Sequence, residues 1–307
     1  MSPRCRPCRE TRCSVAQAIA ACGLAHTRRH EASRPTPHRS PAFSPGRFQP
    51  SNGTAFLIGM LSVCLVVVAV PMNPSGGLDL VCRPTQMNLS PVTNSLPRGI
   101  ALVAFDGSAG EEFEIFAEEE RLLSPGALPR RVTEFRLGRH AAHLALEQLG
   151  REPEPILRGS SREPIWPSGV VGSITHSRNL AIALVGRSSD SAGTGVDLEN
   201  RDRYFPGLET KIAREDEQAR LRQLDAARKA EMTLEIFSAK ESIYKAFFPR
   251  VGRYFGFMTA RIEPGQERLT GYFTEPIDPA YPRDRPMEIG RLWLDDSVLT
   301  WMVLPPD

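Results

Sequence analysis

From about residue 97 to its end, the chain alternates apolar runs with amphipathic and charged stretches. Residues 99–105, GIALVAF, form a continuous apolar run, which predicts a buried strand. A second apolar region, at 170–185, is interrupted by the polar HSRN at 176–179 and predicts a β-hairpin. A third region, at 291–304, contains a pair of aspartates at its centre and predicts another hairpin.

Charged segments of helical character lie between these strands. Residues 111–123 predict an acidic helix, and residues 207–229 predict a charged helical stretch. Between them we expect a long helix that begins with Pro129 and ends before Gly150. Proline suits the first turn of a helix, and glycine suits the residue that follows its last turn.

The most informative helix is predicted at 234–249, LEIFSAKESIYKAFFP, where apolar residues recur at roughly helical spacing. Pro249 is expected to end it, because proline cannot continue the hydrogen-bond ladder. Glu241 and Lys245 are four residues apart, so they share one face of the helix. Taken alone, such a pair is most often a surface ion pair worth about 0.2–0.5 kcal/mol.

A short strand is predicted at 194–200, TGVDLEN, and it supplies two more carboxylates that could act together with Glu241. In a strand, Val196 and Leu198 fall on one face, and Asp197 and Glu199 fall on the other. The ordinary interpretation is a solvent-facing strand edge. The alternative is a Mg²⁺ site, because Mg²⁺ prefers carboxylate oxygens and keeps water and phosphate oxygens in its remaining positions. If the 234–249 helix packs across this strand, Glu241 becomes a third oxygen ligand.

Basic residues on the first long helix have two interpretations. Arg131 and Arg139 are eight residues apart and can point to one side of it, as a solvated basic face or as an anion site. His176 falls at the end of a predicted strand, where functional residues are common, although a lone histidine is more often structural.

Composition narrows the class of protein. The chain has 307 residues, enough for one large or two small domains, and a net charge of +2. All six cysteines lie within residues 1–82, so the remainder needs no disulfide and has no cysteine nucleophile, which agrees with a reducing compartment. The chain has no GxGxxG, Walker, GxSxG or HExxH motif.

The N-terminal region differs from the rest. Residues 1–53 contain nine arginines and many prolines and serines, a composition typical of disorder, and their cysteine spacing does not favour a zinc site. Residues 55–70, AFLIGMLSVCLVVVAV, form an apolar run slightly short for a bilayer span. We favour a mis-assigned start or a dispensable extension, then a membrane anchor, and lastly a secretory signal.

The motifs together resemble the 4′-phosphopantetheinyl transferase superfamily, in particular its enterobactin-synthetase component and the related Sfp-type enzymes. The matching pieces have the family's order and spacing and cover about residues 99–264. They are RRVTEFRLGRHAAHLAL, PILRG, EPIWPSGVVGSITHS, GVDLE, FSAKESIYKAFFP and FGFMTA. One piece such as GVDLE is weakly specific, whereas the ordered set is highly specific.

The resemblance implies an α+β fold of two similar halves related by a pseudo-twofold axis, with the active site at their junction. It places an N-terminal extension at 1–96 and the transferase domain at 97–307, with halves of about 97–193 and 194–307. It implies Mg²⁺-dependent transfer of the 4′-phosphopantetheine arm of coenzyme A (CoA) to a carrier-protein serine, with release of 3′,5′-ADP.

The implied partners are acyl or peptidyl carrier proteins of nonribosomal peptide, polyketide or fatty-acid synthases, as in siderophore or other secondary-metabolite biosynthesis. No nucleic acid is expected to bind. The two-halved relatives imply a monomer. A cytoplasmic location is expected because an exported form would meet no CoA, with a membrane tether through 55–70 as the alternative.

The resemblance also assigns roles by position. The metal ligands are Asp197, Glu199 and Glu241; Glu241 is also the candidate base. Lys245 corresponds to the lysine that contacts the CoA phosphates and is assigned to catalysis with Glu241. The remaining CoA-binding positions are Arg131, Arg139, Arg158, Thr175, His176 and Tyr254.

Three other functions are considered. A Mg²⁺-dependent phosphohydrolase could use the same three carboxylates, but it would not need the arginine-bearing helix or Arg158. A non-catalytic module that binds CoA or a carrier protein is disfavoured, because the acidic positions and Lys245 are all present. A membrane-tethered structural protein would depend on residues 55–70 alone.

Overall fold

The computed structural model describes residues 88–109 and 113–307, all of which belong to one structural unit, Met60–Asp307. The predictions for residues 1–87, including the apolar run at 55–70, lie outside the described residues. Among the residues described, no helix is both long and apolar enough to cross a membrane. The described region contains every residue predicted for the site.

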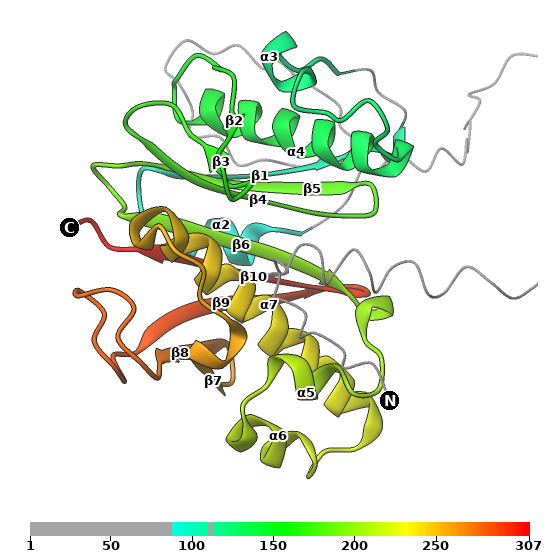
Figure 1. The fold of residues 1–307 in the computed structure, drawn as a ribbon, viewed down its shortest axis with the longest axis vertical. Helices are drawn as coiled ribbons and strands as arrows, with labels where there is room; N and C mark the ends of the chain where they lie inside the picture. Colours follow the sequence, from blue (N-terminus) through cyan, green and yellow to red (C-terminus); the bar gives the residue numbers. More distant parts are fainter. Residues whose placement is uncertain (1–87, 110–112) are drawn as a thin grey trace, which may run out of the picture. The chain divides into compact units, whose positions relative to one another are not determined.

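A three-stranded antiparallel sheet and a long helix form the first part of the fold (Figure 1). The strand order is β1 (Ile100–Asp106), β5 (Leu180–Arg187) and β4 (Val170–Ser177). The turn between β4 and β5 confirms the first predicted hairpin, although His176 lies within β4 itself. Helix α4 (Pro129–Gln148) packs on this sheet, and Gly150 follows it at φ +73°, so both predicted helix ends are confirmed.

Four short elements lie in the same part of the sequence: α2 (Ser90–Thr93), α3 (Ala117–Glu120), β2 (Leu157–Arg158) and β3 (Pro164–Ile165). The acidic helix predicted at 111–123 is wrong in extent, because only α3 is helical in the described part of that stretch. Phe116 before it has an extended backbone, and its N–H donates to the Glu119 carboxylate at 3.0 Å. That bond fixes the start of the helix.

A five-stranded antiparallel sheet forms the second part of the fold. Its order is β6 (Gly193–Asn200), β10 (Ser297–Leu304), β9 (Met287–Leu294), β8 (Arg268–Phe273) and β7 (Ala260–Pro264). The turn between β9 and β10 confirms the second predicted hairpin. The stretch predicted as helical at 207–229 contains α5 (Leu208–Ile212), α6 (Glu215–Leu221) and the start of α7 (Ala226–Val251).

Helix α7 is longer than predicted. The expectation that Pro249 ends it is wrong, because the helix continues to Val251. Proline loses its own N–H bond and crowds the carbonyl four residues before it, and here both effects fall close to the helix end. Gly252 then adopts φ +64°, and its N–H donates to the Phe248 carbonyl at 2.9 Å. This glycine ends the helix.

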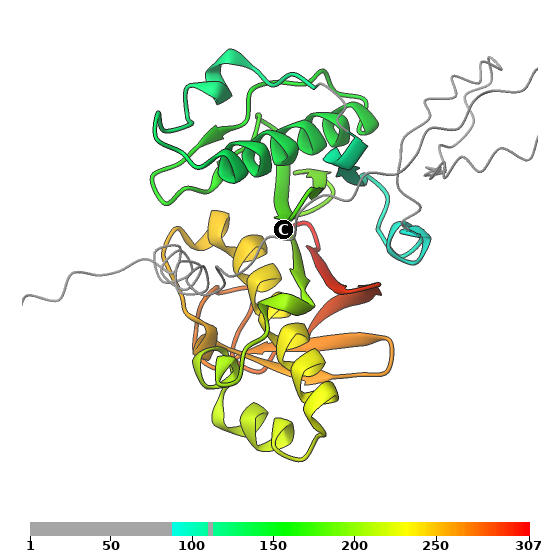
Figure 2. The same cartoon turned by 90° about the vertical axis from the view of Figure 1, so that its right-hand side faces the viewer.

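The two sheets meet where β4 lies beside β6, and Figure 2 shows the strands between α4 and α7. Side chains join them. The Val196 N–H donates to the Ser173 hydroxyl at 3.1 Å. The Leu198 N–H donates to the Thr175 hydroxyl, also at 3.1 Å. Alternate residues of β4 thus satisfy alternate N–H groups of β6, and this leaves Asp197 between them.

Candidate active site

Two glycines allow α7 to lie directly on β6. A Cβ atom added to Gly195 would lie 1.9 Å from the Ser242 carbonyl oxygen, and one added to Gly193 would lie 2.4 Å from the Ala246 carbonyl oxygen. No side chain fits at either position, so the helix and strand backbones are in contact. The Ser238 hydroxyl donates to the Asp197 carbonyl at 3.3 Å. This packing brings the Glu241 and Lys245 turn of the helix to Asp197.

Asp197 is the centre of the acidic group and is only 4% exposed. Lys245 Nζ donates to its Oδ1 at 2.8 Å and to the Val196 carbonyl at 2.9 Å. Thr175 Oγ1 lies 3.5 Å from the same Oδ1. Asp197 Oδ2 is buried and has no hydrogen-bond partner. A buried carboxylate oxygen without a partner is costly, so this atom is suited to a cation.

Glu199 and Glu241 both lie close enough to Asp197 for its negative charge to affect their pKa values. Burial, followed by the charge of Asp197, raises the pKa of Glu199 to about 8. The same two causes raise the pKa of Glu241 to about 7. Arg203, whose Nε lies 3.2 Å from Glu199 Oε2, opposes both shifts. Without a cation, these carboxylates therefore hold protons near neutral pH.

The donor set fits a divalent cation such as Mg²⁺, because it consists of carboxylate oxygens whose mutual repulsion a cation would relieve. In residues 88–109 and 113–307, however, no three acidic, histidine or cysteine side chains are already arranged to hold a metal ion. Binding of an ion by Asp197, Glu199 and Glu241 would need side-chain rotation.

His176 and Arg131 lie near this group and share one carboxylate. His176 Nδ1 is 3.8 Å from Glu134 Oε2, and Arg131 Nη1 donates to the same oxygen at 3.3 Å. Burial lowers the pKa of His176, the Glu134 charge opposes that shift, and Lys245 and Arg131 reinforce it. The structure thus brings His176, Arg131 and Lys245 into one basic region.

Arg139 and Arg158 form a second basic region. Arg139 is 7% exposed, and burial lowers its pKa to about 10, with Glu119 opposing the shift and Arg158 adding to it. Its Nη2 donates to the Leu157 carbonyl at 3.4 Å, whereas its Nε is buried without a hydrogen-bond partner. Arg158 donates to the Leu122 carbonyl at 2.9 Å. Two guanidinium groups that repel each other are suited to an anionic ligand.

Thr175 and Tyr254, which were also predicted to bind CoA, lie outside the two basic regions. The Thr175 hydroxyl is already bonded to β6, so its side chain joins the sheets, and its contact with CoA stays a prediction. Tyr254 is 56% exposed, and its ring centroid lies 5.9 Å from that of Tyr244. Burial and then the Glu241 charge raise its pKa, which places it beside the acidic group.

Three residues near the site were not predicted: Glu119, Glu134 and Arg203. Glu134 follows Arg130 and Arg131 at helical spacing, which is a usable sequence signal. Arg203 follows Glu199 by four residues, but the first lies in a short 3₁₀ turn and the second in β6, so a helical spacing carries no information there. Glu119 is one of three consecutive glutamates, and nothing local distinguishes it.

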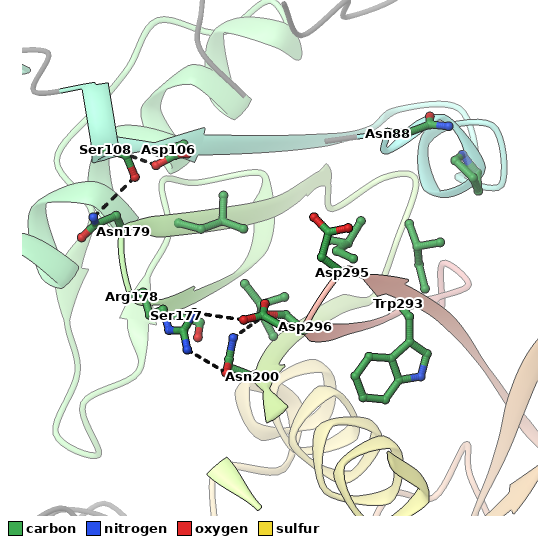
Figure 3. A pocket seen from close by; sticks show the side chains of 16 residues that line it. Asn88, Asp106, Ser108, Ser177, Arg178, Asn179, Asn200, Trp293, Asp295 and Asp296 are labelled. Atoms are coloured by element: carbon green, nitrogen blue, oxygen red, sulfur yellow. Dashed lines mark hydrogen bonds and ion pairs between the residues drawn. The ribbon is translucent and has the colours of Figure 1, made fainter. Parts of the chain in front are cut away.

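A pocket of about 560 Å³ lies elsewhere, at the tips of the two hairpins (Figure 3). Leu198 and Asn200 line it, so it lies on the face of β6 opposite Asp197 and Glu199. Arg178 bridges its wall, with donors 3.0 Å from Asp296 Oδ2 and 3.1 Å from Asn200 Oδ1. These bonds connect the hairpin turns, and the acidic group lies outside this pocket.

Comparison with protein families gives two adjacent matches. Residues 118–186 match the family described as 4′-phosphopantetheinyl transferase N-terminal domain. Residues 193–283 match the 4′-phosphopantetheinyl transferase superfamily. The first match contains α4, β4 and all but the last residue of β5, and the second contains β6 and α7. The acidic group lies within the second match.

Individual proteins give the same result. The 4′-phosphopantetheinyl transferase PptT of Mycobacterium tuberculosis is 40% identical over 52% of this chain and 70% of its own length. Enterobactin synthase component D of Salmonella typhimurium is 32% identical over 65% of this chain and 83% of its own. The solved holo-[acyl-carrier-protein] synthase of Thermotoga maritima has 16% identity and a TM-score of 0.32, too low to bear on the fold.

Proposed function

The chain belongs to the 4′-phosphopantetheinyl transferase superfamily, and we propose that it transfers the phosphopantetheine arm of CoA with a Mg²⁺ site at Asp197. The acceptor is a serine of a carrier protein, and the second product is 3′,5′-ADP. The observation that supports this site best is Asp197 itself. Its Oδ1 is bonded to Lys245, and its buried Oδ2 has no hydrogen-bond partner.

Asp197, Glu199 and Glu241 would hold the metal ion. Bound Mg²⁺ supplies positive charge against the oxygens of the CoA diphosphate and makes its phosphorus easier to attack. Oxygen ligands and neighbouring phosphate are the environment that this ion prefers. The raised pKa values of Glu199 and Glu241 support a cation at this place, because a cation lowers them.

The basic side chains bind and orient CoA, which carries several phosphate charges. Lys245 is bonded to Asp197, and His176 lies within the influence of Lys245 and Arg131, so these three side chains can neutralise the diphosphate. Arg139 and Arg158 offer a second anion site on the same part of the fold. Two separate basic regions fit a ligand whose phosphates are separated along its length.

Glu241 is the proposed base. The serine hydroxyl oxygen forms a bond to the β-phosphorus of CoA, and the bond from that phosphorus to 3′,5′-ADP breaks. The hydroxyl proton passes to Glu241, directly or through a water molecule. A general base typically contributes about 10²–10⁴-fold to the rate.

The two sheets support the proposed halves. The first, about 97–193, contains α4 on the β1-β5-β4 sheet, and the second, about 194–307, contains α7 on the larger sheet. The site lies where β4 meets β6, at the boundary between them. We propose that one chain forms the whole site as a monomer, and that it acts in the cytoplasm on acyl or peptidyl carrier proteins.

A carrier-labelling assay tests the function. The protein is incubated with CoA and an apo-carrier protein, with Mg²⁺ or with EDTA, and the carrier is weighed by mass spectrometry. We expect a mass gain of one phosphopantetheine arm only with Mg²⁺. Hydrolysis of CoA without labelling would favour a phosphohydrolase, and CoA binding without either reaction would favour a non-catalytic module.

A further inference from the structure

Glu134 is a buried carboxylate outside the predicted site. It lies on α4 and is 4% exposed. Its Oε1 accepts from Arg130 Nε at 2.7 Å. Its Oε2 accepts from Arg131 Nη1 at 3.3 Å and lies 3.8 Å from His176 Nδ1. One carboxylate thus connects a residue of α4 with a residue of β4.

The packing of α4 on β4 fixes this connection. A Cβ atom added to Gly138 would lie 3.0 Å from Ile174 Cγ2, so the helix approaches the strand closely there. Glu134 lies one helical turn before Gly138, and His176 lies two residues after Ile174 on the same strand face. The close approach therefore sets Glu134 against His176.

The charges around His176 show why a carboxylate is useful here. Arg131 on α4 and Lys245 on α7 are positive, whereas Glu134 on α4 and Asp197 on β6 are negative. Cations gathered for a polyanion repel one another before it binds. Glu134 offsets that repulsion on the side of the region formed by α4.

We propose that Glu134 is a positioning residue for CoA: it holds Arg131 and the His176 ring in the arrangement that receives the phosphates. This inference rests on the proposed function. At 3.8 Å from Nδ1, the Glu134 charge favours a proton on that nitrogen, which leaves Nε2 for the ligand. Glu134 acts through these two residues and does not itself contact CoA.

The test is Glu134→Gln, which keeps the size of the side chain and removes its charge. We expect the KM for CoA to rise about tenfold or more, the loss of one charge-assisted contact. Both kcat and the KM for the carrier stay within about twofold. The pKa of His176, followed by NMR, falls below its wild-type value, a change that a purely structural role would not cause.

Glu120→Gln is the matched control. Glu120 is a partly exposed glutamate of α3 that pairs with Arg136 of α4 at 2.7 Å, so the change in charge is the same but lies away from His176. Its KM for CoA and its His176 pKa should equal those of wild type. If Glu134→Gln behaves like Glu120→Gln, the proposal is overturned.

Two further outcomes of the experiment can be distinguished: a variant that does not fold, and a wild type that has no transferase activity. If Glu134→Gln does not fold, Glu134→Asp replaces it, and its dissociation constant for CoA should rise at least about threefold because the shorter side chain draws away from His176. An unchanged constant would overturn the proposal. If wild type binds CoA but labels no carrier, the proposed function fails, while the dissociation constants still decide the role of Glu134.

Discussion

Asp197, Glu199 and Glu241 are buried or partly buried carboxylates, and burial, followed by the charge of Asp197, raises the pKa of the other two. For a carboxylate with a raised pKa, stability is present below the unfolded-state pKa of about 4.5 and is lost as the pH rises through the folded-state value. The folded-state values are about 7 and about 8, so the loss falls between about pH 5 and pH 8.

Glu199→Gln isolates this effect in EDTA. Glutamine cannot ionise, so we expect the Tm of the variant minus that of wild type to increase from about pH 5 to about pH 8.5. Differential scanning calorimetry at each pH measures it. Saturating Mg²⁺ should stabilise wild type more at the higher pH. A difference in Tm that is constant with pH would show that Glu199 does not carry the raised pKa.

Glu241→Gln tests two roles in one residue. Removing a base alone costs about 10²–10⁴-fold in rate, and this change would also remove a metal ligand. We therefore expect kcat for carrier labelling to fall by more than about 10⁴-fold. A variant within tenfold of wild type would refute both roles.

For single residues, the sequence predicts site residues whose neighbours in the structure are also close in the sequence. Asp197 and Glu199 alternate on one strand, and Glu241 and Lys245 lie one helical turn apart, so both pairs follow from spacing alone. The spacing of Glu134 after Arg130 and Arg131 offers the same kind of signal, but its contact with His176 could not be found in this way, because His176 lies on a strand distant in sequence. The Thr175 hydroxyl likewise bonds to β6, a contact that only the folded chain shows.

Among the elements, the contact of α7 with β6 determines the site. Gly195→Ala would place a Cβ atom 1.9 Å from the Ser242 carbonyl and force the helix away from Asp197. We expect the free energy of unfolding to fall by about 1–3 kcal/mol, with a larger relative loss of labelling activity. Urea denaturation and the labelling assay measure the two effects.

Gly126→Ala is the control for this change. A Cβ atom at Gly126 would have no neighbour within 4 Å, so stability should stay within about 0.5 kcal/mol and activity should be unchanged. If Gly195→Ala behaves like Gly126→Ala, the close contact of helix and strand is not needed for the site.

The pattern of apolar residues predicted most strands and the long helices, but it misjudged some of their ends. Helix α7 continues past Pro249 because Gly252, and not the proline, closes its last turn. In the described part of the stretch expected as a helix at 111–123, only α3 is helical, because the Glu119 side chain bonds to the backbone that precedes it. Both errors arise where one local hydrogen bond determines the end of a helix, whatever the helical tendency of the segment as a whole.

For the whole molecule, the prediction concerns the contribution of α2, which precedes β1, to the stability of the fold. Val92 on α2 has no exposed surface and packs with Leu102 and Val196. We expect a chain that starts at Met87 to label carriers as well as the full chain does. A chain that starts at Arg98 should lose about 1.5–3 kcal/mol of stability, because it lacks Val92. Equal stability of the two shortened chains would contradict this role of α2.

The central claim is that one divalent ion is held by carboxylates from β6 and α7. The most direct measurement is the anomalous scattering of Mn²⁺, used in place of Mg²⁺, in crystals of the protein with CoA. We predict one peak at about 2–2.3 Å from oxygen atoms of Asp197, Glu199 and Glu241. A peak away from these side chains, or none at a saturating Mn²⁺ concentration, would contradict the account.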